Sequence, residues 1–313
     1  MTAAFSKSIL IISIIYLRNG YDKARMPFGC VAGRVPRMTI NSRATSRGTK
    51  ESRMKSLLSG IAAAGLLIAS AFAVSSAMAE DLEAIKSAGT MKIAMTGQYP
   101  PFNFVNDQNE VVGFDASVGM EIAKRMGVEG EIVTTAWDGI IAGLLANKFD
   151  TIVGSMTITP EREKAVDFVG PYYHAGRAVF VMEDAEVQAL DDLKGKTLGV
   201  TLGETHEKWA REQGGWDIRT YKGLPELMLE LKAGRVDAIV VDNIPVMVAI
   251  KETGDKIRRL DTPDIEGGSV AIGIAIRKDN PELKAAMQAA LDEMMEDGTY
   301  EKIAMEWVGS DIR

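Results

Sequence analysis

Short apolar runs alternate with amphipathic segments along the chain from residue 80 onward. The apolar runs have the length of strands buried in a sheet, and the amphipathic segments have the period of helices that cover one. The pattern predicts an α/β fold with strands at 91–95, 150–157, 178–182, 197–201, 237–242 and 269–276. Helices are predicted at 115–126, 138–147, 160–165, 205–212, 224–233, 281–296 and 299–307.

Parts of this pattern repeat. The segments "LLANKFDTIVGS" (144–155) and "ELKAGRVDAIVVD" (230–242) share a helix end, a turn, a basic residue, an Asp and an apolar strand. A second pair, "KIAMTG" (92–97) and "LGVTLG" (198–203), consists of strands that stop at a glycine. The repeats favour two similar lobes whose strand ends face a shared crevice. Because β-turn-α units look alike, coincidence stays open on pattern alone.

The N-terminal part has a different character. From Met54, "MKSLLSGIAAAGLLIASAFAVSSAMAED" has a basic start, an apolar centre and small residues at Ala77 and Ala79. This predicts a signal peptide at 54–79, cut after Ala79, and a periplasmic protein. The alternative is a membrane anchor, since the apolar part approaches the roughly 20 residues that span a bilayer. Residues 1–53 are interpreted as an extension upstream of the true start codon.

Without this leader the charge and the inventory of reactive groups change. Residues 1–79 hold 11 of the 36 Lys and Arg but only 2 of the 43 Asp and Glu, which leaves a net charge of about −16. Such a chain is unsuited to nucleic acid. Cys30, the single cysteine, is lost, and the histidines are His174 and His206. Thiol nucleophiles, zinc clusters and most His-based triads are therefore excluded, and no metal or cofactor is expected.

Three residues indicate a site for a zwitterion. Arg162 follows the predicted helix start at Thr159 in "MTITPERE", where a cation is unfavourable unless it pairs with an anion or its stem covers apolar surface. Thr205 begins a helix whose free N–H groups suit an anion, although it can equally be an ordinary cap. Asp242 ends an apolar strand and is either an ammonium acceptor or the cap of the next turn.

Two aromatic residues lie beside these candidates. Tyr99 precedes two prolines in "GQYPPFNF", and Trp137 lies in "TAWDGI" before a predicted helix. Both can be core residues, the usual position of aromatic side chains. At the mouth of a crevice they would instead cover the apolar faces of a ligand and exclude water.

These segments resemble a known family over essentially all of residues 80–313. The motifs, in order, are "YPPFNF", "GFDASVGMEIAKRM", "WDGIIAGLLANKFD", "TITPEREKAVDFVGPYY", "LKGKTLGVTLGET", "LKAGRVDAIVVD", "GIAIRKDNPELKAAMQAAL" and "GTYEKIAMEWVG". They are similar to the polar amino-acid group of periplasmic solute-binding proteins of ABC transporters, the family 3 extracellular solute-binding proteins. The resemblance implies a two-lobed periplasmic-binding-protein fold, each lobe a β-sheet flanked by helices, joined by two hinge strands. Lobe 1 is expected at 80–180 and 273–313, and lobe 2 at 181–272.

The resemblance also implies ligand-binding roles. The position of Arg162 binds the α-carboxylate of an amino acid with the help of Thr157 and Thr205, and the position of Asp242 accepts the α-ammonium. Other positions hold the ligand's main-chain groups or sandwich its side chain: Gly154, Ser155, Tyr99 and Trp137.

The pocket for the ligand's side chain is expected to include Thr96, Glu204 and His206. Relatives selective for basic amino acids often carry an acid where this chain has Thr96, which favours a polar, neutral ligand. Glu204 stands where a small hydroxyl is common, and Ser117 replaces the second acid of the family signature Gly-Phe-Asp-x-Asp.

The sequence therefore predicts a monomeric binding protein, not an enzyme, that captures a free amino acid between two closing lobes. It would deliver this amino acid to the permease of an ABC transporter, with no cofactor and no nucleic-acid partner. Two other classes stay open. One is a periplasmic dehydratase of prephenate-like acids on the same fold, and the other is a soluble accessory sensor of amino acids.

Overall fold

The computed structural model describes residues 81–262 and 269–313. The predicted extension (1–53), the signal peptide (54–79) and its cleavage site lie outside the described residues. Within the part of the chain that is described, no helix is both long enough and apolar enough to cross a bilayer.

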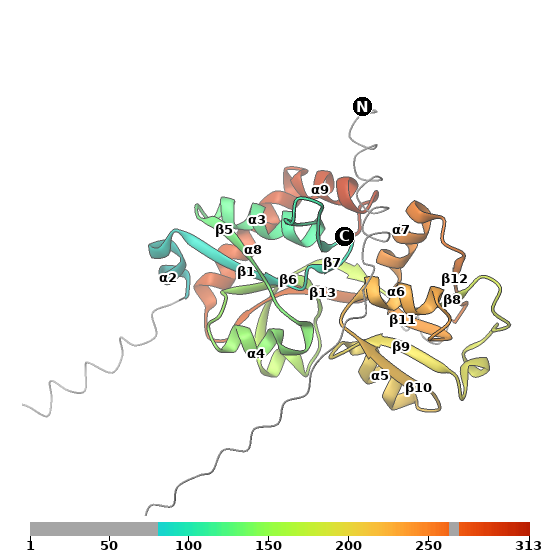
Figure 1. Cartoon of the computed structure of the whole chain (residues 1–313). Coiled ribbons are helices and arrows are strands. Elements are labelled where there is room, and N and C mark those ends of the chain that lie inside the picture. The colour runs from blue at the N-terminus through green and yellow to red at the C-terminus, as the bar shows by residue number, and fades with distance from the viewer. Residues whose placement is uncertain (1–80, 263–268) are drawn as a thin grey trace, which may run out of the picture. The chain divides into compact units, whose positions relative to one another are not determined.

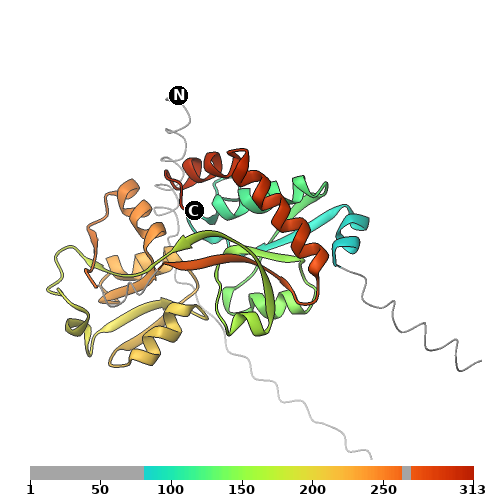
Figure 2. The same cartoon turned by 180° about the vertical axis from the view of Figure 1, so that it is seen from behind.

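The first sheet has five strands in the order β5-β1-β6-β13-β7 (Figure 1). These strands are β5 (Glu129–Thr134), β1 (Thr90–Met95), β6 (Thr151–Thr157), β13 (Val270–Arg277) and β7 (Val166–Ala175). β1 pairs parallel with β5 and β6, whereas β13 pairs antiparallel with β6 and β7. Figure 2 shows β13 and β7 running side by side through this sheet. All residues of β6 except the last are buried, as expected for a strand covered on both faces.

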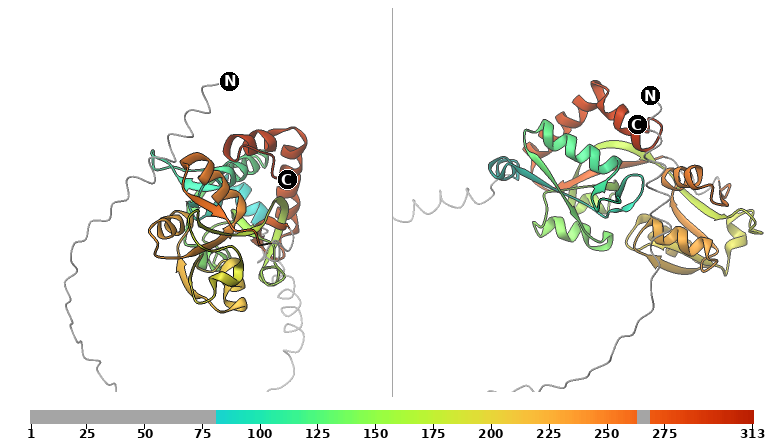
Figure 3. Two further views of the ribbon diagram at one scale, coloured as in Figure 1. Left: turned by 90° about the vertical axis from the view of Figure 1, so that its right-hand side faces the viewer. Right: turned by 45° about the horizontal axis from the view of Figure 1, so that its top comes forward.

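Helices cover both faces of the first sheet. The helices α3 (Phe114–Arg125), α8 (Pro281–Glu296) and α9 (Thr299–Trp307) lie on one face, and α4 (Ile140–Leu145) lies on the other (Figures 1 and 3). A short helix, α2 (Asp81–Ala88), precedes β1. Ser117 on α3 accepts a hydrogen bond from the indole N–H of Trp307 on α9 (2.9 Å), so this departure from the family signature joins two helices.

The second sheet repeats this architecture, with five strands in the order β10-β9-β11-β8-β12. They are β10 (Asp217–Tyr221), β9 (Thr197–Thr201), β11 (Ala238–Asp242), β8 (Arg177–Met182) and β12 (Ile257–Arg259). The helices that pack against it are α5 (Thr205–Gln213), α6 (Leu224–Lys232) and α7 (Asn243–Thr253). β9 is parallel to β10 and β11, and β8 is antiparallel to β11.

The two sheets correspond strand by strand, which explains the repeated sequence patterns. β1 and β9 are the strands that stop at a glycine, and β6 and β11 are the strands of the longer repeat. Each pair occupies the same place in its sheet, and each sheet is completed by an antiparallel strand next to β6 or β11. The predicted two-lobed α/β fold is confirmed.

The chain crosses from the first sheet to the second at Gly176, between β7 and β8. The expected lobe boundary at 180/181 falls inside β8, although all paired residues of β8 belong to the second sheet. The boundary at 272/273 falls inside β13, whose partners belong only to the first sheet. The sheets thus divide at slightly different residues from those the sequence indicated, because apolar runs mark strands but not the sheet in which they pair.

Several elements differ from the sequence prediction. The helix expected at 160–165 is wrong: only a short 3-10 helix, η2 (Arg162–Lys164), forms before β7 begins. The helix expected at 138–147 is a 3-10 turn, η1 (Trp137–Gly139), followed by α4. The pattern also missed α2, β5, β7, β10, α7 and β12, together with a small sheet of β2 (Gln98–Tyr99), β3 (Asn103–Val105) and β4 (Val111–Val112). These segments are short, or their strands mix polar and apolar residues, so their periodicity is weak.

Candidate ligand-binding site

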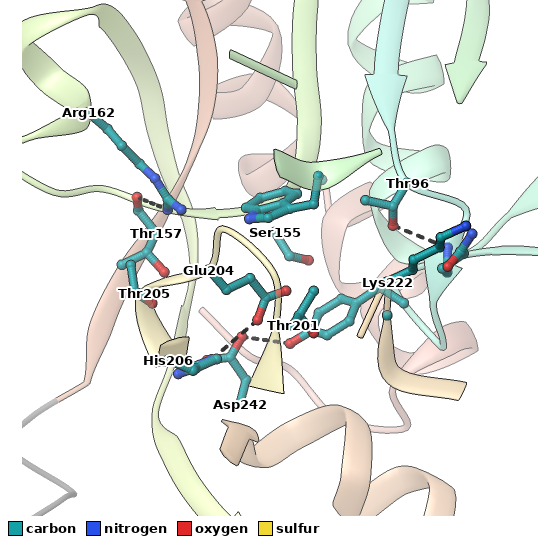
Figure 4. Close-up of a pocket in the computed structure, with 15 residues that line it drawn as sticks. Thr96, Ser155, Thr157, Arg162, Thr201, Glu204, Thr205, His206, Lys222 and Asp242 are labelled. Atoms are coloured by element: carbon teal, nitrogen blue, oxygen red, sulfur yellow. Dashed lines mark hydrogen bonds and ion pairs between the residues drawn. The ribbon is translucent and has the colours of Figure 1, made fainter. Parts of the chain in front are cut away.

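The described residues form a pocket at the carboxyl ends of strands from both sheets, where open α/β sheets bind ligands (Figure 4). The space between the side chains that line it amounts to about 430 Å³ when the open mouth is included, and little of this is enclosed. All eleven residues predicted from the sequence line it: Thr96, Tyr99, Trp137, Gly154, Ser155, Thr157, Arg162, Glu204, Thr205, His206 and Asp242. Four further residues also line it: Gln98, Thr201, Lys222 and Gly223.

Arg162 reaches the pocket from η2. The Thr159 hydroxyl accepts a hydrogen bond from the Arg162 backbone N–H (3.2 Å), so Thr159 does cap this turn although no α-helix follows. The guanidinium donates to the carbonyl oxygen of Thr157 (2.9 Å) and lies 5.5 Å from the ring centre of Trp137. Burial lowers the pKa of Arg162, and no acid among the described residues forms an ion pair with it. A guanidinium held in this way retains donors for a carboxylate.

Thr205 lies close to Arg162 in Figure 4. It is the first residue of α5, and the residue at the N-cap position is Glu204, without a side-chain cap hydrogen bond. The interpretation of Thr205 as an ordinary cap is therefore wrong. Figure 4 shows Arg162, Thr157 and Thr205 together on one side of the pocket, and Thr96 and Lys222 on the opposite side.

Asp242 ends β11 with its side chain in the pocket. Asp242 occupies the N-cap position of α7, as one interpretation expected, but its side chain makes no cap hydrogen bond. The hydroxyl of Tyr99, from the other lobe, donates to Asp242 Oδ2 (2.7 Å). Although burial raises the pKa of Asp242, the stronger combined effect of His206, Tyr99 and Arg177 lowers it below the usual value. Asp242 is therefore a buried, ionised carboxylate.

The second oxygen of this carboxylate is less well satisfied. His206 Nε2 lies 3.3 Å from Asp242 Oδ1, which is close enough for electrostatic attraction. The N–H is not aligned for a hydrogen bond, however, and Oδ1 has no hydrogen-bond donor among the described residues. Buried carboxylate oxygens normally have a donor, so this atom is suited to receive one from a ligand.

Glu204 adds a second acid next to Asp242. Its side chain is 16% exposed, and its Oε2 lies 3.9 Å from His206 Nε2. Burial raises the pKa of Glu204 to about 7; the negative charge of Asp242 acts in the same direction, while His206 and Arg162 oppose it. This carboxyl group can therefore exist in both protonation states near neutral pH.

Ser155 and Thr96 belong to a buried polar network around Asp115, which Figure 4 shows only in part. The Ser155 hydroxyl donates to Asp115 Oδ2 (2.8 Å), and its backbone N–H donates to the Tyr172 hydroxyl (2.9 Å). The Thr96 hydroxyl donates to the side-chain oxygen of Asn103 (2.9 Å), whose amide in turn donates to Asp115 (2.7 Å). The polar hydrogens of Ser155 and Thr96 are thus used inside the protein. Ser155 also adopts φ of +60°, a strained backbone conformation for a residue other than glycine.

The lobes meet closely at two glycines, Gly203 and Gly223, and Gly223 lines the pocket. A Cβ atom at Gly203 would lie 3.1 Å from Cα of Asp138, and one at Gly223 would lie 2.7 Å from the backbone oxygen of Gln98. Gly203 also has φ of +80°, which favours glycine. An ion pair between Glu161 of the first lobe and Lys208 of the second links the exposed surface nearby.

Three of the four lining residues that the sequence analysis missed lie in or directly after elements it did not predict. Gln98 belongs to β2, and Lys222 and Gly223 directly follow β10. Thr201 ends β9, a predicted strand, and could have been found from the rule that ligands bind at carboxyl ends of strands. Among the described residues, no group of three or more His, Cys, Asp and Glu side chains is arranged to hold a metal ion.

The chain is similar to known proteins over its described length. Residues 91–310 match the family described as bacterial extracellular solute-binding proteins, family 3. The L-cystine-binding protein TcyJ of Escherichia coli (strain K12) is 36% identical over 234 residues, 74% of this chain and 87% of that protein.

Two solved structures support the same relationship. The P235GK mutant of ArgBP from T. maritima is 33% identical with a TM-score of 0.69, covering 74% of this chain and 100% of that one. The ancestral amino acid-binding protein AncCDT-1, a precursor of cyclohexadienyl dehydratase, is 35% identical with a TM-score of 0.67, again covering 74% and 100%.

Proposed function

This chain belongs to the bacterial extracellular solute-binding proteins of family 3, and we propose that it captures a free, polar, net-neutral amino acid for an ABC transporter. The similarity to the L-cystine-binding protein TcyJ makes L-cystine the first ligand to test. The predicted signal peptide at 54–79 supports a periplasmic location, and we expect a monomer that docks on membrane permease subunits.

The observation that carries this proposal is the charge arrangement in the pocket. Arg162 offers a guanidinium that no acid among the described residues pairs with, and Asp242 offers a carboxylate oxygen without a hydrogen-bond donor. Burying either group alone is unfavourable, but an amino acid would supply a carboxylate to the first and an ammonium to the second. Water excluded from the pocket would strengthen both interactions.

The contacts between the lobes support capture by closure. Tyr99 of the first lobe donates to Asp242 of the second, so a ligand ammonium on Asp242 would contact groups from both lobes. Any ligand held by both lobes favours the conformation in which they meet, by its differential affinity for that conformation. A transporter could then recognise the liganded protein by the relative positions of its lobes.

The test is calorimetric titration of the mature protein, expressed from Glu80, with L-cystine, L-glutamine, L-arginine and L-glutamate. We expect saturable binding of a net-neutral member and weaker binding of L-arginine and L-glutamate. A thermal-shift measurement provides an independent check, because a ligand that binds only the folded state raises the unfolding temperature. Absence of binding by all four amino acids would refute the proposal.

A dehydratase of prephenate-like acids is the second candidate. Two observations favour it: the similarity to AncCDT-1, and Glu204, whose pKa of about 7 suits a general acid. We infer binding rather than catalysis, since the pocket also offers Asp242 for an ammonium that such substrates lack. Incubation with prephenate and chromatographic detection of an aromatic product decides between the two functions, and product formation that Glu204→Gln abolishes would establish the enzyme.

A further inference from the structure

Two carboxyl groups of the pocket lie beside the same N–H group of His206. His206 Nε2 lies 3.3 Å from Asp242 Oδ1 and 3.9 Å from Glu204 Oε2. One N–H group cannot form aligned hydrogen bonds to both acids, and it is aligned with neither. The two acids and the ring lie together in Figure 4.

The position of Arg177 limits what His206 can donate. Arg177 donates through Nε to His206 Nδ1 (3.1 Å) and stacks on Trp209, 5.1 Å from the ring centre. Because Nδ1 accepts a hydrogen from an arginine, the imidazole carries its own proton on Nε2 while this contact lasts. His206 therefore supplies one N–H group to two acids.

Other groups near Glu204 do not supply enough hydrogen-bond donors for both acids. The Tyr99 hydroxyl from β2 donates to Asp242 Oδ2, and Arg162 from η2 donates to Thr157. Thr201 from β9 can donate one hydrogen to Glu204, which lowers the pKa of that acid less than burial raises it. Around Glu204 and Asp242, the pocket therefore still has more hydrogen-bond acceptors than donors.

We propose that Glu204 is a second acceptor for the ligand's α-ammonium, which bridges Glu204 and Asp242. This inference rests on the proposed function. A primary ammonium carries three N–H donors and one positive charge, so it satisfies both acids at once. A ligand without the amino group supplies a donor to neither acid. Glu204 thereby makes the site selective for ligands that carry an α-ammonium.

The protonation state of Glu204 gives the proposal a second measurable consequence, the dependence of ligand affinity on pH. A bound ammonium favours the ionised acid, so binding is strongest where Glu204 is charged. Burial raises the pKa of Glu204 to about 7, and acidification below this value protonates it before a ligand binds. We therefore expect the affinity of the wild type to fall about tenfold from pH 8 to pH 6. His206, which faces both acids, is present in both proteins compared below.

The experiment compares wild type, Glu204→Gln and Glu212→Gln by calorimetry. The probes are L-cystine, L-glutamine and L-arginine, with their desamino counterparts dithiodipropionate, glutaramate and guanidinovalerate. Glu204→Gln keeps the shape of the side chain but removes its charge, and Glu212→Gln makes the same change at an exposed position of α5. Urea unfolding of each variant verifies that the fold is kept.

We expect Glu204→Gln to weaken amino-acid binding at least about tenfold, without weakening the desamino probes. Its affinity should not vary between pH 6 and pH 8, and Glu212→Gln should behave as the wild type. Equal or tighter amino-acid binding by Glu204→Gln would overturn the inference, since Glu204 would then only repel Asp242. The same pH dependence in Glu204→Gln and wild type would show that a group other than Glu204 causes it, and would also overturn the inference. If no amino acid binds the wild type, the proposed function fails, and this inference fails with it.

Discussion

Replacing Arg162 by alanine should weaken ligand binding without a matching loss of folding stability. The guanidinium is mostly buried, donates to the Thr157 carbonyl and stacks on Trp137, but no acid among the described residues forms an ion pair with it. A residue held in this way serves a bound anion more than it serves the fold. Arg162→Ala should therefore weaken amino-acid binding strongly while leaving the free energy of unfolding nearly unchanged.

The magnitudes follow from these contacts. Removing one partner of a buried, hydrogen-bonded charge pair costs about 2–5 kcal/mol, so an affinity loss of about 100-fold is expected. In the protein without ligand, the change loses a charge-assisted hydrogen bond of about 1.5–3 kcal/mol and a cation–π contact of about 0.5–1 kcal/mol. Relief from keeping a guanidinium out of water offsets these losses by a similar amount. We expect the free energy of unfolding to change by about 1 kcal/mol or less.

Calorimetric titration with the best ligand of the amino-acid panel, and urea unfolding, measure the two effects. Arg162→Lys should bind more weakly than the wild type, because it keeps the charge but loses the two-pronged contact. Lys164→Ala is the matched control, since Lys164 lies in the same 3-10 helix, is exposed and does not line the pocket. An affinity of Arg162→Ala close to that of the wild type, in a folded protein, would refute the carboxylate role.

Three other changes test different parts of the structure. Asp242→Asn should weaken amino acids at least about tenfold but not their desamino analogues, and equal effects on both in calorimetry would contradict its role as ammonium acceptor. Burial raises the pKa of Asp115 to about 6, so the folded state binds more protons than the unfolded state and stability should fall as pH rises from 4 to 6. The wild type should lose about 2 kcal/mol of unfolding free energy over this range relative to Asp115→Asn, and parallel urea midpoints across it would exclude the effect. Gly223→Ala places a Cβ atom 2.7 Å from the backbone oxygen of Gln98 and should weaken binding at least about tenfold by keeping the lobes apart. Gly139→Ala, which meets nothing within 4 Å, is the control in the same titration.

The pattern of apolar and polar residues contains much of the fold. Strands such as β6 and β11 are nearly continuous apolar runs, because helices cover both faces of each sheet. The repeat that contains these two strands indicated two lobes before any contact was known. β7 was missed because "VDFVGPYYHA" mixes charged, polar and turn-forming residues, and its place in the sheet depends on pairing with β13.

The candidate site, like the fold, could be predicted only in part from the sequence. The position of a residue at a strand end or helix start is a local property, so the sequence could indicate Arg162, Thr205 and Asp242. Their ligand-binding roles stay predictions, although all three line one pocket. The partners of Ser155 could not be foreseen, since its hydroxyl donates to Asp115, 40 residues earlier in the chain.

The sequence by itself determined many of the strands and helices, the repeat of one plan in two lobes, and most of the residues that gather at the strand ends. The tertiary structure alone decided which donor meets which acceptor. Tyr99 reaches Asp242 across 143 residues, and Arg177 fixes the proton of His206 between Asp242 and Glu204. The reason is physical: periodicity and capping depend on neighbours in the chain, whereas hydrogen bonds and burial depend on distances that only folding sets.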